Sequence, residues 1–163
     1  MMILVIMMAD RKRIAVVRVR GCVKVPGSLH ATFRNLRLTR VNHCVLLENT
    51  PTNMGAVALV KDYITWGEVD AEAVKALIQS KGRLSGNKVI SEAHLKASGF
   101  DGFDAFAKKF AGFEAELGSV KEMKRVFRLH PPRKGYGTIK KRYPYGALGN
   151  RGAEMEKLLK RMM

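Results

Sequence analysis

The segment HCVLLENTPTNMGAVALVKDYITWGEV, residues 43–69, predicts a strand, a helix and a second strand in succession. Its first six residues form a short apolar run that is typical of a buried strand. Thr50 then suits the N-cap of a helix and Pro51 suits its first position, and the apolar residues that follow recur at helical spacing. Residues 64–69 again have the composition of a strand.

Upstream of this unit, residues 14–20 (IAVVRVR) predict another strand. Apolar side chains alternate with Arg18 and Arg20, so we expect the strand to be half-buried with the arginines on its open face. After the break at residues 26–27, Ser28 is expected to cap a helix with one apolar and one cationic face. Strand, helix, strand, helix and strand predict right-handed crossovers with both helices on one face of the sheet. The other face either stays open or is covered by later residues.

The chain divides by composition into four parts. Residues 1–12 form an apolar leader, which is a short extra strand, a frayed end or an upstream start before Met8. Residues 13–70 form the βαβαβ core, and residues 71–122 form a helical extension with breaks at glycines. Its phenylalanines at 103, 106, 110 and 113 recur at helical spacing and are expected in the core. Residues 123–163 form a basic extended arm that ends in a short helix.

Charge is distributed very unevenly along the chain. The net charge is +16, yet no acidic residue lies between Asp10 and Glu48 or between Glu122 and Glu154. The middle of the chain holds most of the acids. A chain that concentrates cations in this way is expected to bind a polyanion, because each neutralised phosphate releases a counterion. A membrane is the weakest candidate partner, since the leader is too short to span one.

Within the basic arm, glycines, prolines and tyrosines accompany the cations, which favours contact with unpaired RNA bases and phosphates. We expect the arm to be disordered until it binds RNA. The alternative is a solvated flexible tail. Arg34, Arg37 and Arg40 have no acidic partner one helical turn away, which favours RNA contact over an ordinary solvated helix face. A lone Trp66 in a strand is more often part of the core than a stacking platform.

Catalytic and metal-binding patterns have little support. The histidines lack ligand spacing, and the two cysteines form no CxxC unit, so we expect no metal site, no cofactor and a reducing cytoplasmic location. A metal-dependent ribonuclease that uses Asp62, Glu68 and Asp70 is a third hypothesis, but capping and solvation explain these acids more simply. We therefore expect no enzymatic activity and no small-molecule substrate.

Several separated motifs resemble one family of ribosomal proteins. They are LTRVNHC (38–44), ENTP (48–51), KDY (61–63) leading to WGE (66–68), RLHPPR (128–133) and GALG (146–149). In this order they resemble protein thirty of the large subunit in its longer archaeal form, whose eukaryotic counterpart is numbered seven. The resemblance implies an α/β (α+β) fold with a small ferredoxin-like βαβαβ core.

The resemblance also implies a non-enzymatic protein that binds large-subunit rRNA near the 5S rRNA region, alongside neighbouring ribosomal proteins, and supports subunit assembly. A free-standing RNA chaperone or a nucleoid-type nucleic-acid-binding protein is the alternative. The residues expected to contact RNA, from charge, from stacking or from the family motifs, are Arg18, Arg20, Arg34, Arg37, Arg40, Asn42, His43, Lys61, Tyr63, Trp66, His130, Arg133, Lys134, Tyr136, Lys140, Lys141, Arg142, Tyr143, Tyr145 and Arg151.

Overall fold

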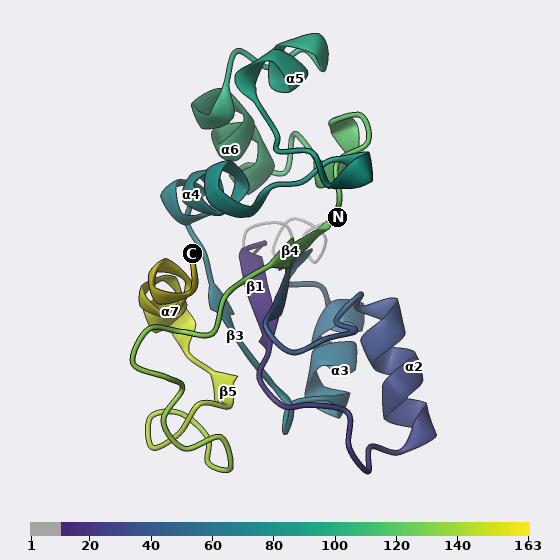
Figure 1. The fold of residues 1–163 in the computed structure, drawn as a ribbon, viewed down its shortest axis with the longest axis vertical. Helices are drawn as coiled ribbons and strands as arrows, with labels where there is room; N and C mark the ends of the chain where they lie inside the picture. Colours follow the sequence, from purple (N-terminus) through teal and green to yellow (C-terminus); the bar gives the residue numbers. More distant parts are fainter. Residues whose placement is uncertain (1–10) are drawn as a thin grey trace, which may run out of the picture.

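A computed structural model describes residues 11–163, and within them five strands form one mixed sheet in the order β4-β2-β1-β3-β5 (Figure 1). The strands are β1 (Arg13–Arg18), β2 (His43–Glu48), β3 (Ile64–Glu68), β4 (Val126–Arg128) and β5 (Gly149–Asn150). The helices are α2 (Gly27–Asn35), α3 (Pro51–Leu59), α4 (Ala71–Lys81), α5 (Glu92–Ala97), α6 (Phe103–Ala111) and α7 (Met155–Met162). The proposed leader lies outside the described residues apart from its last two.

The central strand β1 is antiparallel to both of its neighbours. Val16 lies opposite Val45 of β2 on one side and opposite Trp66 of β3 on the other. The strands β2 and β3 are therefore parallel to each other, and β2–α3–β3 is a crossover around β1. The prediction of a second crossover was wrong, because α2 returns the chain to the end of the sheet where β1 stops. There the Asn42 N–H donates to the Arg18 carbonyl at 2.8 Å.

Both faces of the sheet are covered, so the prediction that β1 is half-buried was wrong. All six residues of β1 are buried. One face packs with α2 and α3, where Val16 joins Phe33 of α2 and Val57 of α3. The opposite face packs with the later helices, where Val17 joins a cluster that includes α4, α6 and α7. The covering of the second face by downstream residues is one of the two outcomes that the sequence left open.

Arg18 is the clearest consequence of this double covering. Its side chain is almost fully buried, and its guanidinium lies 3.8 Å from the ring centroid of Phe33. It donates hydrogen bonds to the carbonyls of Leu38 at 2.7 Å and Arg20 at 3.0 Å. A buried cation of this kind is tolerated because its donors are satisfied and its plane packs on an aromatic ring.

The two early helices start in different ways. Thr50 caps α3 as expected, since its Oγ1 accepts the Asn53 N–H at 3.3 Å. At α2 the N-cap position is Pro26, and no side chain caps the helix. The prediction of Ser28 as the cap was wrong, because the Pro26 carbonyl already accepts the N–H groups of Leu29 and His30 and the helix begins before Ser28.

The residues after Glu122 do not form the extended arm that the sequence suggested. β4 adds to the β2 edge of the sheet, and β5 adds in parallel to the β3 edge. Phe127 of β4 and Leu158 of α7 are buried in the same cluster as Val17. The burial of these apolar residues holds the segment against the sheet. Its two strands cover the edges that β2 and β3 would otherwise expose (Figure 1).

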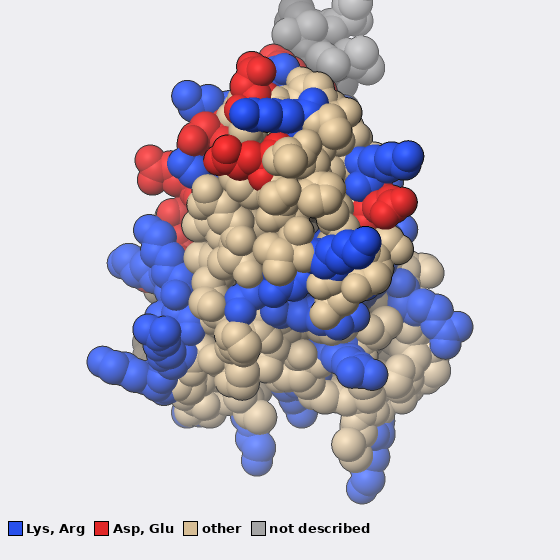
Figure 2. Space-filling model, turned by 45° about the horizontal axis from the view of Figure 1, so that its top comes forward, with Lys and Arg blue, Asp and Glu red and all other residues tan. Residues whose placement is uncertain are grey.

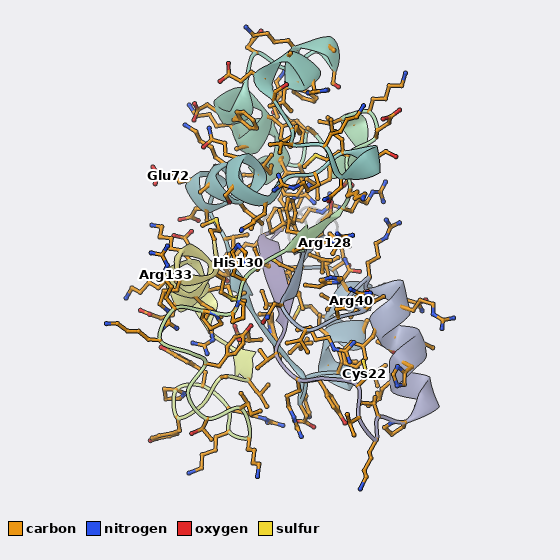
Figure 3. All side chains as sticks on the ribbon, in the orientation of Figure 1. Cys22, Arg40, Glu72, Arg128, His130 and Arg133 are labelled. Atoms are coloured by element: carbon orange, nitrogen blue, oxygen red, sulfur yellow. The ribbon has the colours of Figure 1, made fainter. Side chains whose placement is uncertain are left out.

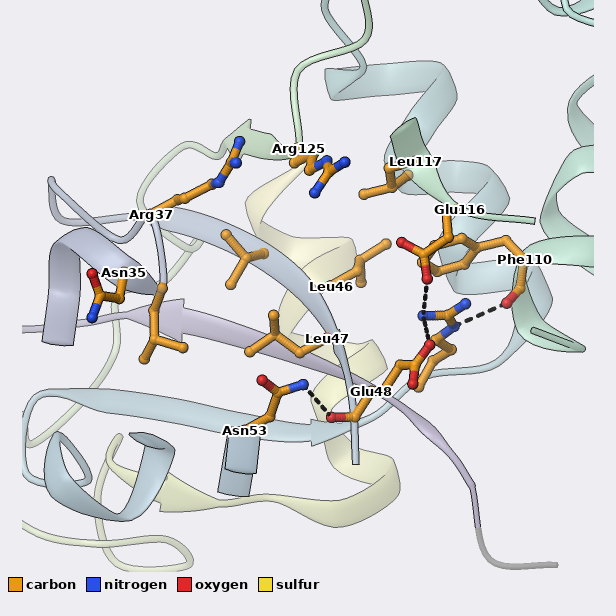
Figure 4. Close-up of a pocket in the computed structure, with 13 residues that line it drawn as sticks. Asn35, Arg37, Leu46, Leu47, Glu48, Asn53, Phe110, Glu116, Leu117 and Arg125 are labelled. Atoms are coloured by element: carbon orange, nitrogen blue, oxygen red, sulfur yellow. Dashed lines mark hydrogen bonds and ion pairs between the residues drawn. The ribbon is translucent and has the colours of Figure 1, made fainter. Parts of the chain in front are cut away.

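Arg13 joins the sheet to the helical extension. Its Nε donates to the Phe110 carbonyl at 2.9 Å, and its Nη2 donates to the Ala115 carbonyl at 3.3 Å. The guanidinium lies 4.0 Å from the Phe110 ring centroid and 4.3 Å from that of Phe113. Glu48 completes the contact at 3.2 Å (Figure 4). Phe106 and Phe110 are buried, which confirms that these two members of the phenylalanine series lie in the core.

Candidate nucleic-acid interface

A groove of about 540 Å³ lies between the end of α2 and strand β4. We call it the basic groove, and among the described residues its lining contains no Asp or Glu. Its lining residues are Arg34, Arg37, Thr39, His43, Met123, Lys124, Arg125, Val126 and Arg128. The two walls therefore come from the two acid-free segments of the sequence, which the fold brings together. Figure 2 shows the wider pattern, with acids gathered in the upper part of that face and cations in the lower part.

Strand pairing and the path of α2 position the groove's cations. His43 of β2 lies directly opposite Arg128 of β4 in the antiparallel register. Arg37 follows α2 in a left-handed conformation, with φ of 60°. Arg37 and Arg125 also line the neighbouring cavity that contains Arg13, and Figure 4 shows the two arginines side by side. Like charges placed this closely repel one another, so the arrangement is suited to an anion between them.

The position of His43 in the basic groove changes the pKa of its imidazole. Burial lowers its pKa below the usual value of 6.5, and the nearby cations Arg128 and Arg40 lower it further. The imidazole lies in contact with Thr39, whose Oγ1 is 3.4 Å from Nδ1. The neutral ring is therefore the favoured form at neutral pH, and it can offer a hydrogen bond to a ligand without adding to the repulsion in the groove.

A second hollow, of about 320 Å³, is formed by the loop that precedes β5. We call it the tyrosine pocket. Its lining residues are Lys134, Gly135, Tyr136, Gly137, Thr138, Tyr143, Pro144, Tyr145, Gly146, Arg151 and Arg161. Arg151 anchors the pocket to the sheet, since its Nε donates to Thr65 Oγ1 at 3.0 Å and its guanidinium lies 5.0 Å from the Tyr143 ring centroid. Burial lowers the pKa of Arg151, with Arg161 adding to the effect.

Several residues expected to contact RNA instead contact other parts of the protein. Arg18 is buried, as described above, and its guanidinium does not reach the surface. The Tyr136 hydroxyl donates to Asn42 Oδ1 at 2.5 Å, so these two predicted site residues bind each other. Tyr63 and Trp66 are partly buried against the α2–α3 side of the sheet. Packing in the core was the favoured interpretation of Trp66.

Other predicted residues lie at the surface but outside the two hollows. Arg142 pairs with Asp62 at 3.2 Å, and Arg20 donates to the Asp62 carbonyl at 3.1 Å. Besides Arg142, the exposed members of the predicted set that line neither hollow are Arg40, Lys61, His130, Arg133, Lys140 and Lys141. Figure 3 shows His130 and Arg133 along the segment after β4, away from Arg40. The predicted set is thus spread over the surface, and only part of it converges.

The three acids considered for metal-dependent cleavage do not form one group, although Glu68 and Asp70 line the same cavity. Asp62 pairs with Arg142, and Glu68 pairs with Lys12 at 3.0 Å. Asp70 stands at the N-cap of α4. Over residues 11–163, no group of three or more His, Cys, Asp or Glu could hold a metal ion. The same part of the chain contains no helix long and apolar enough to cross a membrane.

The groove also contains cations that were not singled out from the sequence. Lys124, Arg125 and Arg128 form one wall, and Arg161 lies beside the tyrosine pocket. The available signal was the acid-free run from 123 to 153, together with the alternation of VFRL at 126–129. Recognising that residues 126–128 form a strand paired with residues 43–45 would have placed Arg128 opposite His43.

Known proteins match this chain over most of its length. A family model described as "Ribosomal protein L30p/L7e" matches residues 14–64. A large ribosomal subunit protein uL30 of Methanococcus vannielii is 47% identical over 152 residues, covering 91% of this chain and 98% of that protein. The uL30 proteins of Archaeoglobus fulgidus and Methanopyrus kandleri are each 42% identical, over 149 and 148 residues. These two matches cover 91% and 88% of this chain and 98% and 99% of the relatives. The chain belongs to the L30p/L7e family of ribosomal proteins.

Proposed function

We propose that this protein is a structural, non-enzymatic constituent of the large ribosomal subunit in the cytoplasm, where it binds large-subunit rRNA and supports subunit assembly. The observation that carries the proposal is the basic groove, in which cations from two distant segments face one another with no carboxylate among the described lining residues. Its relatives bear the name of a large-subunit protein, which agrees with this role.

The charge arrangement supports an RNA partner in particular. Arg37 and Arg125 are adjacent, although two guanidinium groups repel one another in the absence of an anion, and Arg128 lies opposite the neutral His43. A phosphate backbone removes the repulsion and releases its own counterions. The groove is open and follows the edge of the sheet, which suits a strand of sugar-phosphate more than a small ligand.

We further propose, as the family resemblance implies, that the rRNA partner lies near the 5S rRNA region of the large subunit, with other large-subunit proteins as neighbours. Exposed cations outside the groove, including Arg40, Lys140 and Lys141, would neutralise other phosphates of the same RNA. The alternative of a free-standing chaperone or a nucleoid-type protein uses the same charges, but the named relatives give it no support.

Filter binding to large-subunit rRNA across a salt series tests the proposal. Replacing Arg34, Arg37 and Arg128 together with Gln should reduce the slope of log K against log salt by about 3, or about 1 per lost phosphate contact. A matched control replaces the exposed cations Lys88, Lys96 and Lys108 of the helical extension. The control should leave the slope nearly unchanged. Equal effects of the two triple variants would refute the role of the groove.

Sedimentation of the tagged protein in a sucrose gradient separates the proposal from its alternative. A constituent of the large subunit should migrate with that subunit, and a free factor should stay near the top of the gradient. Migration near the top would contradict the proposal.

A further inference from the structure

We propose that the tyrosine pocket binds a single unpaired nucleotide of RNA, with its base on Tyr145 and its phosphate beside Lys134 and Arg161. This inference rests on the proposed function, because it assumes an RNA partner. The pocket differs from the groove because its lining includes tyrosines beside the cations, whereas no Phe, Tyr or Trp is among the described residues that line the groove.

The aromatic side of the pocket contains one ring that is available for stacking. Tyr145 is 84% exposed, which is unusual for a side chain that buries well in cores and interfaces. Tyr136 is not available, because its hydroxyl is bonded to Asn42 and its ring is partly buried. Tyr143 lies against Arg151. Of the three tyrosines, therefore, Tyr145 is the one without a packing role among the residues described.

The floor of the pocket is rigid, which a specific site requires. Arg151 donates through Nε to Thr65 of β3 and through Nη2 to the Ala147 carbonyl at 3.2 Å. The Arg151 N–H also donates to the Trp66 carbonyl at 2.8 Å. These bonds tie the Arg151–Tyr143 contact to the sheet. A base that stacks on Tyr145 would thus lie beside a surface that is hydrogen-bonded to the sheet.

The charge of the tyrosine pocket and its exposure to solvent suit a nucleotide as ligand. Lys134 and Arg161 are both exposed, and no Asp or Glu of the described chain lines the pocket. Gly135 and Gly137 have φ of 74° and 73°, and a Cβ added at either would meet nothing within 4 Å. The backbone is therefore open to a ligand on that side. The volume of about 320 Å³ falls at the small end of the range for pockets that enclose a small ligand, roughly 300–1,000 Å³.

Selectivity for unpaired RNA tests the proposal. The full chain is titrated against two labelled probes, a short oligouridine and a blunt RNA duplex, with fluorescence anisotropy as the readout. Bases inside a duplex already stack on their neighbours and cannot reach Tyr145, so Tyr145→Ala should weaken oligouridine binding about tenfold and leave binding along the duplex unchanged. Tyr145→Phe keeps the ring and should retain the affinity of the original protein. Lys134→Gln should reduce the salt slope on oligouridine by about 1.

Two outcomes would refute the proposed nucleotide binding by the tyrosine pocket and leave the proposed role of the basic groove intact. One is Tyr145→Ala binding oligouridine as tightly as the original protein, and the other is an equal loss on both probes. In either case normal filter binding to large-subunit rRNA would show that the proposed function stands. Failure of the unaltered protein to bind large-subunit rRNA would instead refute the proposed function. Because Tyr145 is so exposed, circular dichroism should show the same fold for each Tyr145 variant.

Discussion

Replacing Arg13 with methionine should lower the free energy of unfolding by about 2–4 kcal/mol, from one buried acceptor left unsatisfied and from lost contacts with the phenylalanine rings. The Arg13 side chain is 4% exposed, so water cannot take over its contacts when it is removed. The Ala115 carbonyl would lose its donor, at about 1–3 kcal/mol for a buried acceptor left unsatisfied, whereas the Phe110 carbonyl would keep the Phe113 N–H at 3.2 Å. Methionine keeps the stem and part of the contact with the phenylalanine rings, which offsets a fraction of the loss.

The carbonyl and ring contacts, more than the ion pairs, are responsible for this stabilisation. Burial lowers the pKa of Arg13 even though Glu48 and Glu116 both act to raise it. Desolvation is therefore a larger effect on this guanidinium than the attraction to either carboxylate alone, and Arg11 lowers the pKa as well. Glu116 is 61% exposed and contributes least. Glu48→Gln should accordingly destabilise the protein by less than half as much as Arg13→Met.

Urea unfolding, followed by the fluorescence of the single Trp66, measures the effect. The slope of free energy against urea should be unchanged, so that the shift in midpoint reports stability alone. Lys157→Met is the matched control, because it removes a cation from an exposed ion pair with Glu154. Hydrogen exchange should also quicken in α6 more than in α3, since Arg13 contacts only the former. A loss below about 1 kcal/mol for Arg13→Met would refute the reasoning.

Three further predictions concern other parts of the fold. A thiol reagent should label Cys22 but not Cys44 in the native protein, because Cys22 is exposed whereas Cys44 is buried and burial raises the pKa of its thiol; labelling of both without urea would contradict this. Between about pH 5.5 and 7.5 the free energy of unfolding should rise with pH, in part through His43: its lowered pKa means that the unfolded chain binds the proton more tightly. His43→Gln should flatten that rise, and an unchanged slope would exclude the residue. Gly67→Ala should destabilise the protein by about 1–3 kcal/mol, because the new methyl group would overlap the Gly152 carbonyl, and an unchanged melting temperature would show that the neighbouring turn gives way.

The three central strands and the helices between them could be predicted from the sequence because their signals are local. Thr50 and Pro51 mark the start of α3, and alternating or continuous apolar runs mark the strands. Pairing between distant residues could not be predicted in the same way. β4 and β5 have three and two residues, which is too short for a periodic pattern, and their places depend on partners far along the chain.

The same limit applies to the candidate site. Arg34, Arg37 and His43 were expected at an RNA-binding surface, and the structure places all three in the basic groove. Arg18 shows why an alternating pattern can mislead. Its charge suggested a surface position, but Phe33 and nearby carbonyls provide an internal environment that satisfies it. A sequence pattern identifies the polarity of a side chain but not the tertiary acceptors that it will meet.

The way in which β4 and β5 close the sheet has a consequence for synthesis. His43 pairs with Arg128 and Thr65 pairs with Gly149, so each edge of the sheet is completed by residues made long after the strand they join. Chains emerge from the amino end first, and distant pairings form late because a large loop must close beforehand. A polypeptide interrupted before Met123 has one wall of the groove and lacks the other. Incomplete chains would thus bind the same RNA more weakly than full-length chains. The order of the strands therefore favours binding by the full-length protein.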